Sequence, residues 1–150
     1  MVPRALEAPV GRAALLCLLA AGVFCAALAL LTRPAAPLLS AGTGMYAAED
    51  ALRWTGSQAD FPLAPHSGPT VVDLALQFSS WPGRDAAQGW LESDAGTLGE
   101  YRVTPQRQHL TILLPPGASF LRLRSTLGQP PGDWRWLGVQ VLSIAARPSG

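Results

Sequence analysis

Residue types that perform acid–base, nucleophilic or metal chemistry are scarce in this sequence. The two histidines, His66 and His109, lie far along the chain from both cysteines, Cys17 and Cys25, which fall in an apolar run near the N-terminus. A zinc site needs several His, Cys or carboxylate ligands at suitable spacing, and the sequence has no such grouping. The sequence therefore predicts no catalytic residue, no metal ligand and no cofactor.

Carboxylates offer the remaining route to catalysis. Glu92, Asp94 and Glu100 surround a predicted hairpin, and a retaining glycosidase needs two carboxyl groups about 5 Å apart. Solvated turn residues are the simpler interpretation, so a hydrolase stays a minor alternative. Calcium needs several oxygen ligands. The aspartates that would contribute to a calcium site form no D-x-D-x-D pattern: Asp50, Asp85 and Asp133.

Tryptophan is the most informative residue type that remains. Trp134 and Trp136 flank Arg135 in the segment DWRWLG, and Trp81 precedes a Pro-Gly turn. An exposed indole has a large apolar face that can stack against a sugar ring, and it also suits the interface between lipid and water. The candidate ligand-binding residues are Trp134, Trp136, Trp81 and Gln140.

Strand parity separates this tryptophan pair from its arginine. If Leu137, Val139 and Val141 point into a core, Arg135 shares their side of the strand. The residues expected on the opposite face are Trp134, Trp136, Gly138 and Gln140. The sequence therefore predicts a pair of indoles on a non-core face, without the arginine between them.

The neighbours of the pair are interpreted as structural. We expect Arg135 to be held by the carboxylate of Asp133, and Gly138 to leave room beside the indoles. The inward parity must shift by one residue near 142–143 for Ile144 to reach the core, and a β-bulge would produce that shift.

Charge excludes one class of partner. The net charge is +1 and there are no blocks of like charge, so the chain lacks the electrostatic footprint of a nucleic-acid-binding protein. A basic stripe that binds a glycan or a phosphate is an alternative to a solvated outer face for four arginines: Arg102, Arg107, Arg122 and Arg124.

The elements that would position these residues are short strands. Apolar and polar residues alternate in 70–79, 109–114 and 120–125, and turn residues separate the runs. Weaker strands are predicted at 49–54, 58–63, 86–92, 97–103 and 136–146, with a hairpin turn at 93–96. This pattern predicts an all-β fold, a two-sheet antiparallel β-sandwich of jelly-roll type. Trp54 and Trp90 are expected to pack structurally in its core.

The N-terminal third differs from the rest. Residues 13–32 carry no charge and are long enough to cross a bilayer core as a signal-anchor helix. Arg4 and Arg12 precede this span, which predicts that residues 1–12 are cytoplasmic. Residues 33–45 read as a linker and 46–147 as a β-sandwich domain on the extracytoplasmic side of the cytoplasmic (inner) membrane. A signal peptide cleaved after Ala27-Leu28-Ala29 remains the alternative.

The C-terminal part also carries a family resemblance. It resembles the exported β-sandwich domains, similar to carbohydrate-binding modules, of bacterial membrane glycosyltransferase-like proteins from filamentous anoxygenic phototrophs. The matching residues are Arg53-Trp54-Thr55, Leu98-Gly99, Ser125-Thr126, Pro130, Asp133, Arg135 and Leu137-Gly138-Val139. The chain departs from that family in having one predicted span and no transferase body, so the resemblance implies a sandwich module without the catalysis.

Two functional hypotheses follow. The first is a membrane-anchored, non-enzymatic envelope protein whose sandwich binds a glycan or an envelope protein, with the lipid bilayer as a further partner. The second is a single-pass accessory subunit of a larger membrane complex. Its helix would pack through small residues: Ala20, Ala21, Gly22, Ala26 and Ala27.

Overall fold

A computed structural model of the chain describes residue 39 and residues 42–50 and 52–149. The predicted cytoplasmic N-terminus (1–12) and membrane helix (13–32) lie outside these residues. Within the described part, no helix has the length and apolarity needed to cross a membrane.

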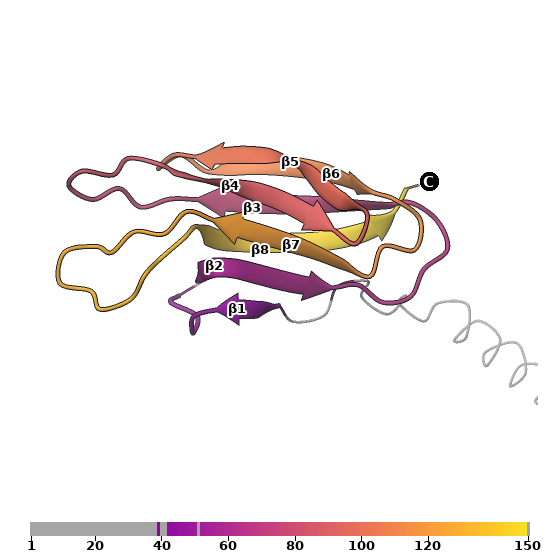
Figure 1. Cartoon of the computed structure of the whole chain (residues 1–150), viewed down its shortest axis with the longest axis horizontal. Coiled ribbons are helices and arrows are strands. Elements are labelled where there is room, and N and C mark those ends of the chain that lie inside the picture. The colour runs from indigo at the N-terminus through magenta and orange to yellow at the C-terminus, as the bar shows by residue number, and fades with distance from the viewer. Residues whose placement is uncertain (1–38, 40–41, 51, 150) are drawn as a thin grey trace, which may run out of the picture. The chain divides into compact units, whose positions relative to one another are not determined.

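The described part of the chain contains eight strands, connected by turns and loops (Figure 1). They are β1 (Thr43–Met45), β2 (Arg53–Pro62), β3 (Thr70–Gln77), β4 (Ala87–Ser93), β5 (Gly96–Val103), β6 (Gln108–Leu114), β7 (Phe120–Ser125) and β8 (Gln140–Pro148). Every paired strand is antiparallel to its neighbour. The all-β fold predicted from the sequence is confirmed, and the jelly-roll subtype stays a prediction.

The strands form one continuous path, in the order β5-β4-β7-β2-β8-β3-β6, with β1 on the free side of β2. Strand β2 belongs to both sheets of the sandwich. Its residues 58–62 pair with β7 of one sheet, whereas Arg53 and Trp54 pair with Val141 and Gln140 of β8 in the other sheet. The two sheets are therefore linked at the start of β2, beside the point where the β7–β8 segment enters β8.

Alternating side chains of both sheets build the core. In β3, Val72, Leu74 and Leu76 are buried and Asp73 is partly exposed, because successive strand residues point to opposite faces. The largest fully buried side chains are Phe61, Phe78, Leu74, Leu76, Leu114, Leu121, Leu123 and Leu137. Residues 137, 139 and 141 are buried as predicted, but Gly138 and Gln140, which were expected on the opposite, non-core face, are buried as well.

The predicted bulge in β8 is also present. Ala75 pairs with Ser143 and Leu76 with Val141, so Leu142 is the extra residue on β8. The bulge resets the parity, and Ile144 packs against the core.

Three expectations differ from the structure. The two strands predicted at 49–54 and 58–63 are not separate: a turn is followed by a single ten-residue strand, β2. Strand β1 lies inside the predicted linker 33–45, and Leu39 forms a bridge with Leu63, so the sandwich begins before residue 46. Trp90 is 43% exposed, because β4 turns its small residues and Leu91 inward and its Trp90 outward.

The sandwich has two ends with different loops (Figure 1). At the end where β3 and β7 finish and β8 begins lie the β3–β4 loop (78–86) and the β7–β8 loop (126–139). We call this the aromatic end. At the opposite end, Leu63 pairs with Leu39 and donates its N–H to Ser119 O. Strand β8 runs between the ends, roughly 25–30 Å at the usual rise per residue.

Candidate functional site

The β7–β8 loop carries two exposed tryptophans. The side chains of Trp134 and Trp136 are 80% and 55% exposed. Below them, Gly128 and Leu137 exchange two backbone hydrogen bonds of 3.0 and 2.8 Å, which fix the loop as a narrow hairpin. Gly132 at the tip has φ +80°, a conformation that glycine adopts without strain. The loop therefore projects two indoles from a defined backbone.

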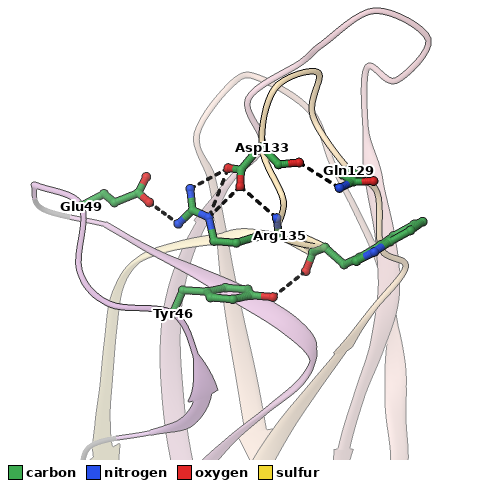
Figure 2. Close-up of polar contacts among 6 residues, drawn as sticks. Tyr46, Glu49, Gln129, Asp133 and Arg135 are labelled. Carbon is green, nitrogen blue, oxygen red and sulfur yellow. Dashed lines mark hydrogen bonds and ion pairs between the residues drawn. The ribbon is translucent and has the colours of Figure 1, made fainter.

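Arg135, which lies between the two tryptophans in the sequence, is held by three neighbours, Asp133, Glu49 and Tyr46, and we call these four residues the Arg135 cluster. Its Nε donates to Asp133 Oδ1 (3.0 Å), its Nη2 to Asp133 Oδ2 (2.7 Å), and its Nη1 to Glu49 Oε1. The guanidinium lies 5.5 Å from the centre of the Tyr46 ring. Figure 2 shows the guanidinium between the two carboxylates, and Gln129 donating to the backbone oxygen of Asp133 (2.9 Å).

These contacts join the loop to a segment distant in sequence. Glu49 lies 86 residues from Arg135, in the turn between β1 and β2, and Tyr46 donates its hydroxyl to Trp136 O over 3.2 Å. The backbone N–H of Arg135 also donates to Asp133 Oδ1. Hydrogen bonds thus restrain Asp133, which precedes Trp134, as well as Arg135 and the backbone oxygen of Trp136.

Electrostatics supports the same arrangement. The hydrogen bond from the Arg135 side chain lowers the pKa of Asp133 to about 2, and Asp133 in turn raises the pKa of Arg135. Both groups are therefore charged throughout the physiological pH range. Hydrogen bonds between charged partners are stronger and more directional than neutral ones, so the cluster restrains the loop more tightly than neutral contacts would.

A buried chain of hydroxyl groups supports the base of the loop. Tyr101 donates to Arg124 O (2.9 Å) and its hydroxyl contacts Ser125 Oγ (2.5 Å), which lies 3.4 Å from Thr55 Oγ1. Thr55 Oγ1 accepts the N–H of Val139 over 3.0 Å. Four strand or loop segments therefore meet at the two points where the loop leaves and rejoins the sheets. Burial raises the pKa of Tyr101 to about 12, so its hydroxyl stays a donor.

Gly138 completes this base because nothing larger fits there. A Cβ at this position would lie 2.4 Å from Thr55 Oγ1 and 2.7 Å from Ser125 Cβ. The glycine predicted to leave room beside the indoles instead allows β2 and β7 to approach the returning chain.

Trp81 belongs to a second group, the Arg84 cluster, formed by Trp54, Phe78, Trp81 and Arg84. The rings of Phe78 and Trp81 are 4.7 Å apart, and Trp54 lies 6.2 Å from each. The Arg84 guanidinium sits 5.3 Å and 5.5 Å from the centres of the Phe78 and Trp81 rings and donates to Thr126 O over 2.6 Å. Trp81 therefore packs in this cluster, next to the start of the β7–β8 loop.

The structure thus separates the four candidate binding residues. Trp134 and Trp136 are both exposed on the β7–β8 loop, whereas Trp81 is partly buried in the Arg84 cluster. Gln140 is 5% exposed and donates to Ser79 Oγ over 3.0 Å. Trp54, predicted to be structural, is buried. Sequence analysis missed Tyr46, and no local signal links it to a loop more than eighty residues away.

Several of the other charged groups considered for chemistry form structural contacts instead. On the outer face of the sheet, Arg122 pairs with Asp60 (2.6 Å) and Arg124 with Glu92 (3.0 Å), so these arginines form no free basic stripe. Asp94 accepts the N–H of Ser119, which lowers the pKa of Asp94. Among residues 42–50 and 52–149, no group of three or more His, Cys, Asp or Glu is arranged to hold a metal.

Two grooves lie elsewhere in the sandwich, each about 410 Å³. One is bordered by Met45, Phe61 and Ile144, the other by Leu98 and Leu110. Neither groove includes Trp134 or Trp136 in its lining. With exposures of 80% and 55%, the two indoles suit contact with one face of a ligand better than enclosure.

No protein-family model and no curated protein matches the sequence. Among solved structures, the chain is similar to the C-terminal CBM6 of LamC, a marine laminarinase from Zobellia galactanivorans. The identity is 13% and the TM-score 0.47, over 72% of this chain and 91% of that one. A second similar structure is an Xyl-CBM35 in complex with a disaccharide that contains glucuronic acid. Here the identity is 14% and the TM-score 0.33, over 79% of this chain and 96% of that one. Because both TM-scores are below 0.5, neither similarity indicates what this chain binds.

Proposed function

We propose that this chain is a binding protein whose Trp134–Trp136 surface stacks against the rings of a glycan. One observation carries the proposal: two indoles, 80% and 55% exposed, project from a loop that ion pairs and a hydroxyl chain hold in place. Exposed aromatic side chains that a protein holds rigidly are typical of contact sites, since they bury much apolar area on binding and lose little entropy.

The surroundings of the indoles favour a ring with an apolar face. The adjoining residues Pro130, Pro131 and Gly132 have short or no side chains and so add little bulk to this loop. The indole face matches the C–H face of a pyranose ring, and polar hydroxyls at the edge of that ring stay in water. Each such contact is worth about 1 kcal/mol beyond area burial, so two of them together give a modest affinity for one chain.

We further propose that the chain is not an enzyme and acts by tethering. In this proposal residues 13–32 anchor it in the cytoplasmic membrane, and the sandwich faces the extracytoplasmic side. Within the sandwich itself, Leu39 pairs with Leu63 at the end opposite the β7–β8 loop. The anchor would keep the surface near its ligand and raise its effective concentration.

An envelope protein is the second candidate partner. Leu127, on the same loop, is 36% exposed and adds aliphatic area that a sugar would not need. In this alternative the chain is an accessory subunit of a larger membrane complex. Such a complex could contain a membrane glycosyltransferase-like protein of the kind whose β-sandwich domains the sequence resembles. Its tryptophans would then be interface anchors, the role in which Trp is enriched at protein contacts.

A glycan array with the full chain in detergent tests the proposal. The comparison uses wild type, the double variant Trp134→Ala with Trp136→Ala, and Trp90→Ala as the matched control, since Trp90 is an exposed tryptophan on the outer sheet face. We expect binding by wild type and the control, and loss of it in the double variant. Equal binding by all three would exclude the stacking surface, and binding only to a co-purified membrane protein would favour the accessory subunit.

A further inference from the structure

The arginine that lies between the two tryptophans in the sequence is already paired with two carboxylates. Free arginine side chains bind carboxylates, phosphates and sulfates through a fork of N–H donors, so a Trp-Arg-Trp segment resembles a site for acidic sugars. Here Nε and Nη2 of Arg135 donate to Asp133, and Nη1 donates to Glu49. The Tyr46 ring lies over the same guanidinium. Each of the three guanidinium nitrogens thus already donates to a carboxylate, and the side chain is only 21% exposed, which leaves few donors for an acidic sugar.

The charge that remains at this surface is negative. Two carboxylates, Asp133 and Glu49, face one guanidinium, so the three groups together carry one excess negative charge. Exposure strengthens the effect: the side chain of Glu49 is 46% exposed, against 21% for Arg135. Of these two ion-pair partners, the acid is therefore the more accessible to a ligand that contacts this loop.

Arg84 keeps its positive charge at the base of the same loop, since its acceptors are neutral oxygens, but among the described residues no hydrogen bond or ion pair joins it to residues 134–136. Arg84 donates to Thr126 and covers the Phe78 and Trp81 rings, and Arg53 borders the groove beside Asp50. Within the described residues, the charged side chains that contact the Trp134–Trp136 segment are those of the Arg135 cluster.

We propose that this surface takes uncharged sugars and discriminates against uronic acids and sulfated sugars, with Glu49 and Asp133 as the specificity-determining residues. The inference rests on the proposed glycan binding and names the class of its ligand. Repulsion between like charges separated by one or two side chains, partly screened by salt, predicts a preference of roughly three- to ten-fold at low ionic strength. Added salt should reduce that preference.

Matched glycans test the inference on the full chain. The probes are oligogalacturonides with the carboxyl groups methyl-esterified or free, together with an array of neutral and acidic oligosaccharides. We expect the bound glycans to be neutral, and each acidic counterpart to bind more weakly by the stated factor. Equal or stronger binding of the acidic members would overturn the inference. If no glycan binds at all, the proposed function itself fails, and the two failures are therefore distinguishable.

A charge-release variant sharpens the test. Glu49→Gln with Asp133→Asn frees the Arg135 guanidinium, so binding to the acidic probes should rise by about ten-fold relative to wild type. The matched control is Glu92→Gln, which frees Arg124 of its partner on the outer sheet face and should leave the preference unchanged. Thermal unfolding of each variant verifies the fold. If the double variant does not fold, the preference of wild type alone decides.

Discussion

Two arginine–aromatic clusters lie at the same end of this sandwich. They contain similar residues but have different structural roles. In the Arg84 cluster, the guanidinium covers Phe78 and Trp81 and donates to backbone and hydroxyl oxygens of the β7–β8 loop. In the Arg135 cluster, the guanidinium meets two carboxylates and one tyrosine. The first cluster buries its aromatic rings, and the second leaves the neighbouring indoles in solvent.

The difference shows how a loop can be rigid without being buried. The Arg84 cluster attaches the start of the β7–β8 loop to the core, where apolar contact supplies the stability. The tip lies outside the core, so ion pairs and backbone hydrogen bonds take over its restraint. Substitutions in the first cluster should therefore change the free energy of unfolding, and those in the second should change mainly the loop and what it binds.

The largest effect is expected for Phe78→Ala. Phe78 is completely buried and contacts Trp54, Trp81 and Arg84, so its loss leaves a cavity in the Arg84 cluster. The free energy of unfolding should fall by about 3–5 kcal/mol, measured by urea denaturation. A loss below about 1 kcal/mol would mean that this cluster is not part of the core.

The hydroxyl chain below the loop should give the next largest effect. Tyr101→Phe removes the donor to Arg124 O and the contact with Ser125 Oγ, for a loss of about 1–3 kcal/mol. The pKa of Tyr101 is raised to about 12 in the folded protein, whereas the unfolded chain ionises near 10. Its contribution is therefore full below about pH 10 and declines as the pH rises toward 12. Denaturation curves at alkaline pH should show this decline in wild type and a smaller one in Tyr101→Phe.

Arg84→Ala should have a smaller effect than either. The variant loses the bonds to Thr126 and Ala86 and exposes the Phe78 and Trp81 rings, at a cost of about 1–2 kcal/mol. Arg84→Lys is the control, since it keeps the charge but not the fork of donors. If lysine restores full stability, the guanidinium geometry is not what attaches the loop.

Acid should release the loop tip with little change in the core. The pKa of Asp133 is lowered to about 2, so its stabilising contact with Arg135 is complete above its ordinary pKa near 4 and is lost as the pH falls through 2. Tryptophan fluorescence should report this release in wild type between about pH 4 and 2. Asp133→Asn should lack the transition, and an unchanged acid profile in that variant would place the titration elsewhere.

The strands were the most predictable part of the molecule. Residues 120–125 coincide with β7, and 93–96 spans the predicted hairpin turn, because alternation and turn residues are local signals. Trp90 was assigned to the core by its size, whereas parity along β4 turns it outward. At Trp90 parity was the sounder guide, whereas at Gln140 parity predicted a non-core position and the residue is buried.

The candidate site was predictable only in part. Local parity separates Trp134 and Trp136 from the inward residues that follow, and the Asp133–Arg135 contact joins residues two apart. Glu49 and Tyr46 come from another hairpin, and the exposure of Trp81 depends on how the β3–β4 loop folds over Phe78. Such contacts depend on tertiary packing, which a single sequence does not encode locally.

Paired measurement of binding and unfolding on the Trp134→Ala, Trp136→Ala double variant tests the central claim most directly. The full chain is titrated with the strongest glycan from the array, and its thermal unfolding is recorded in parallel. We expect affinity to fall by at least ten-fold while the free energy of unfolding changes by no more than about 0.5 kcal/mol, since both side chains are exposed. Unchanged affinity in a folded double variant would contradict the claim that these two indoles are the binding surface.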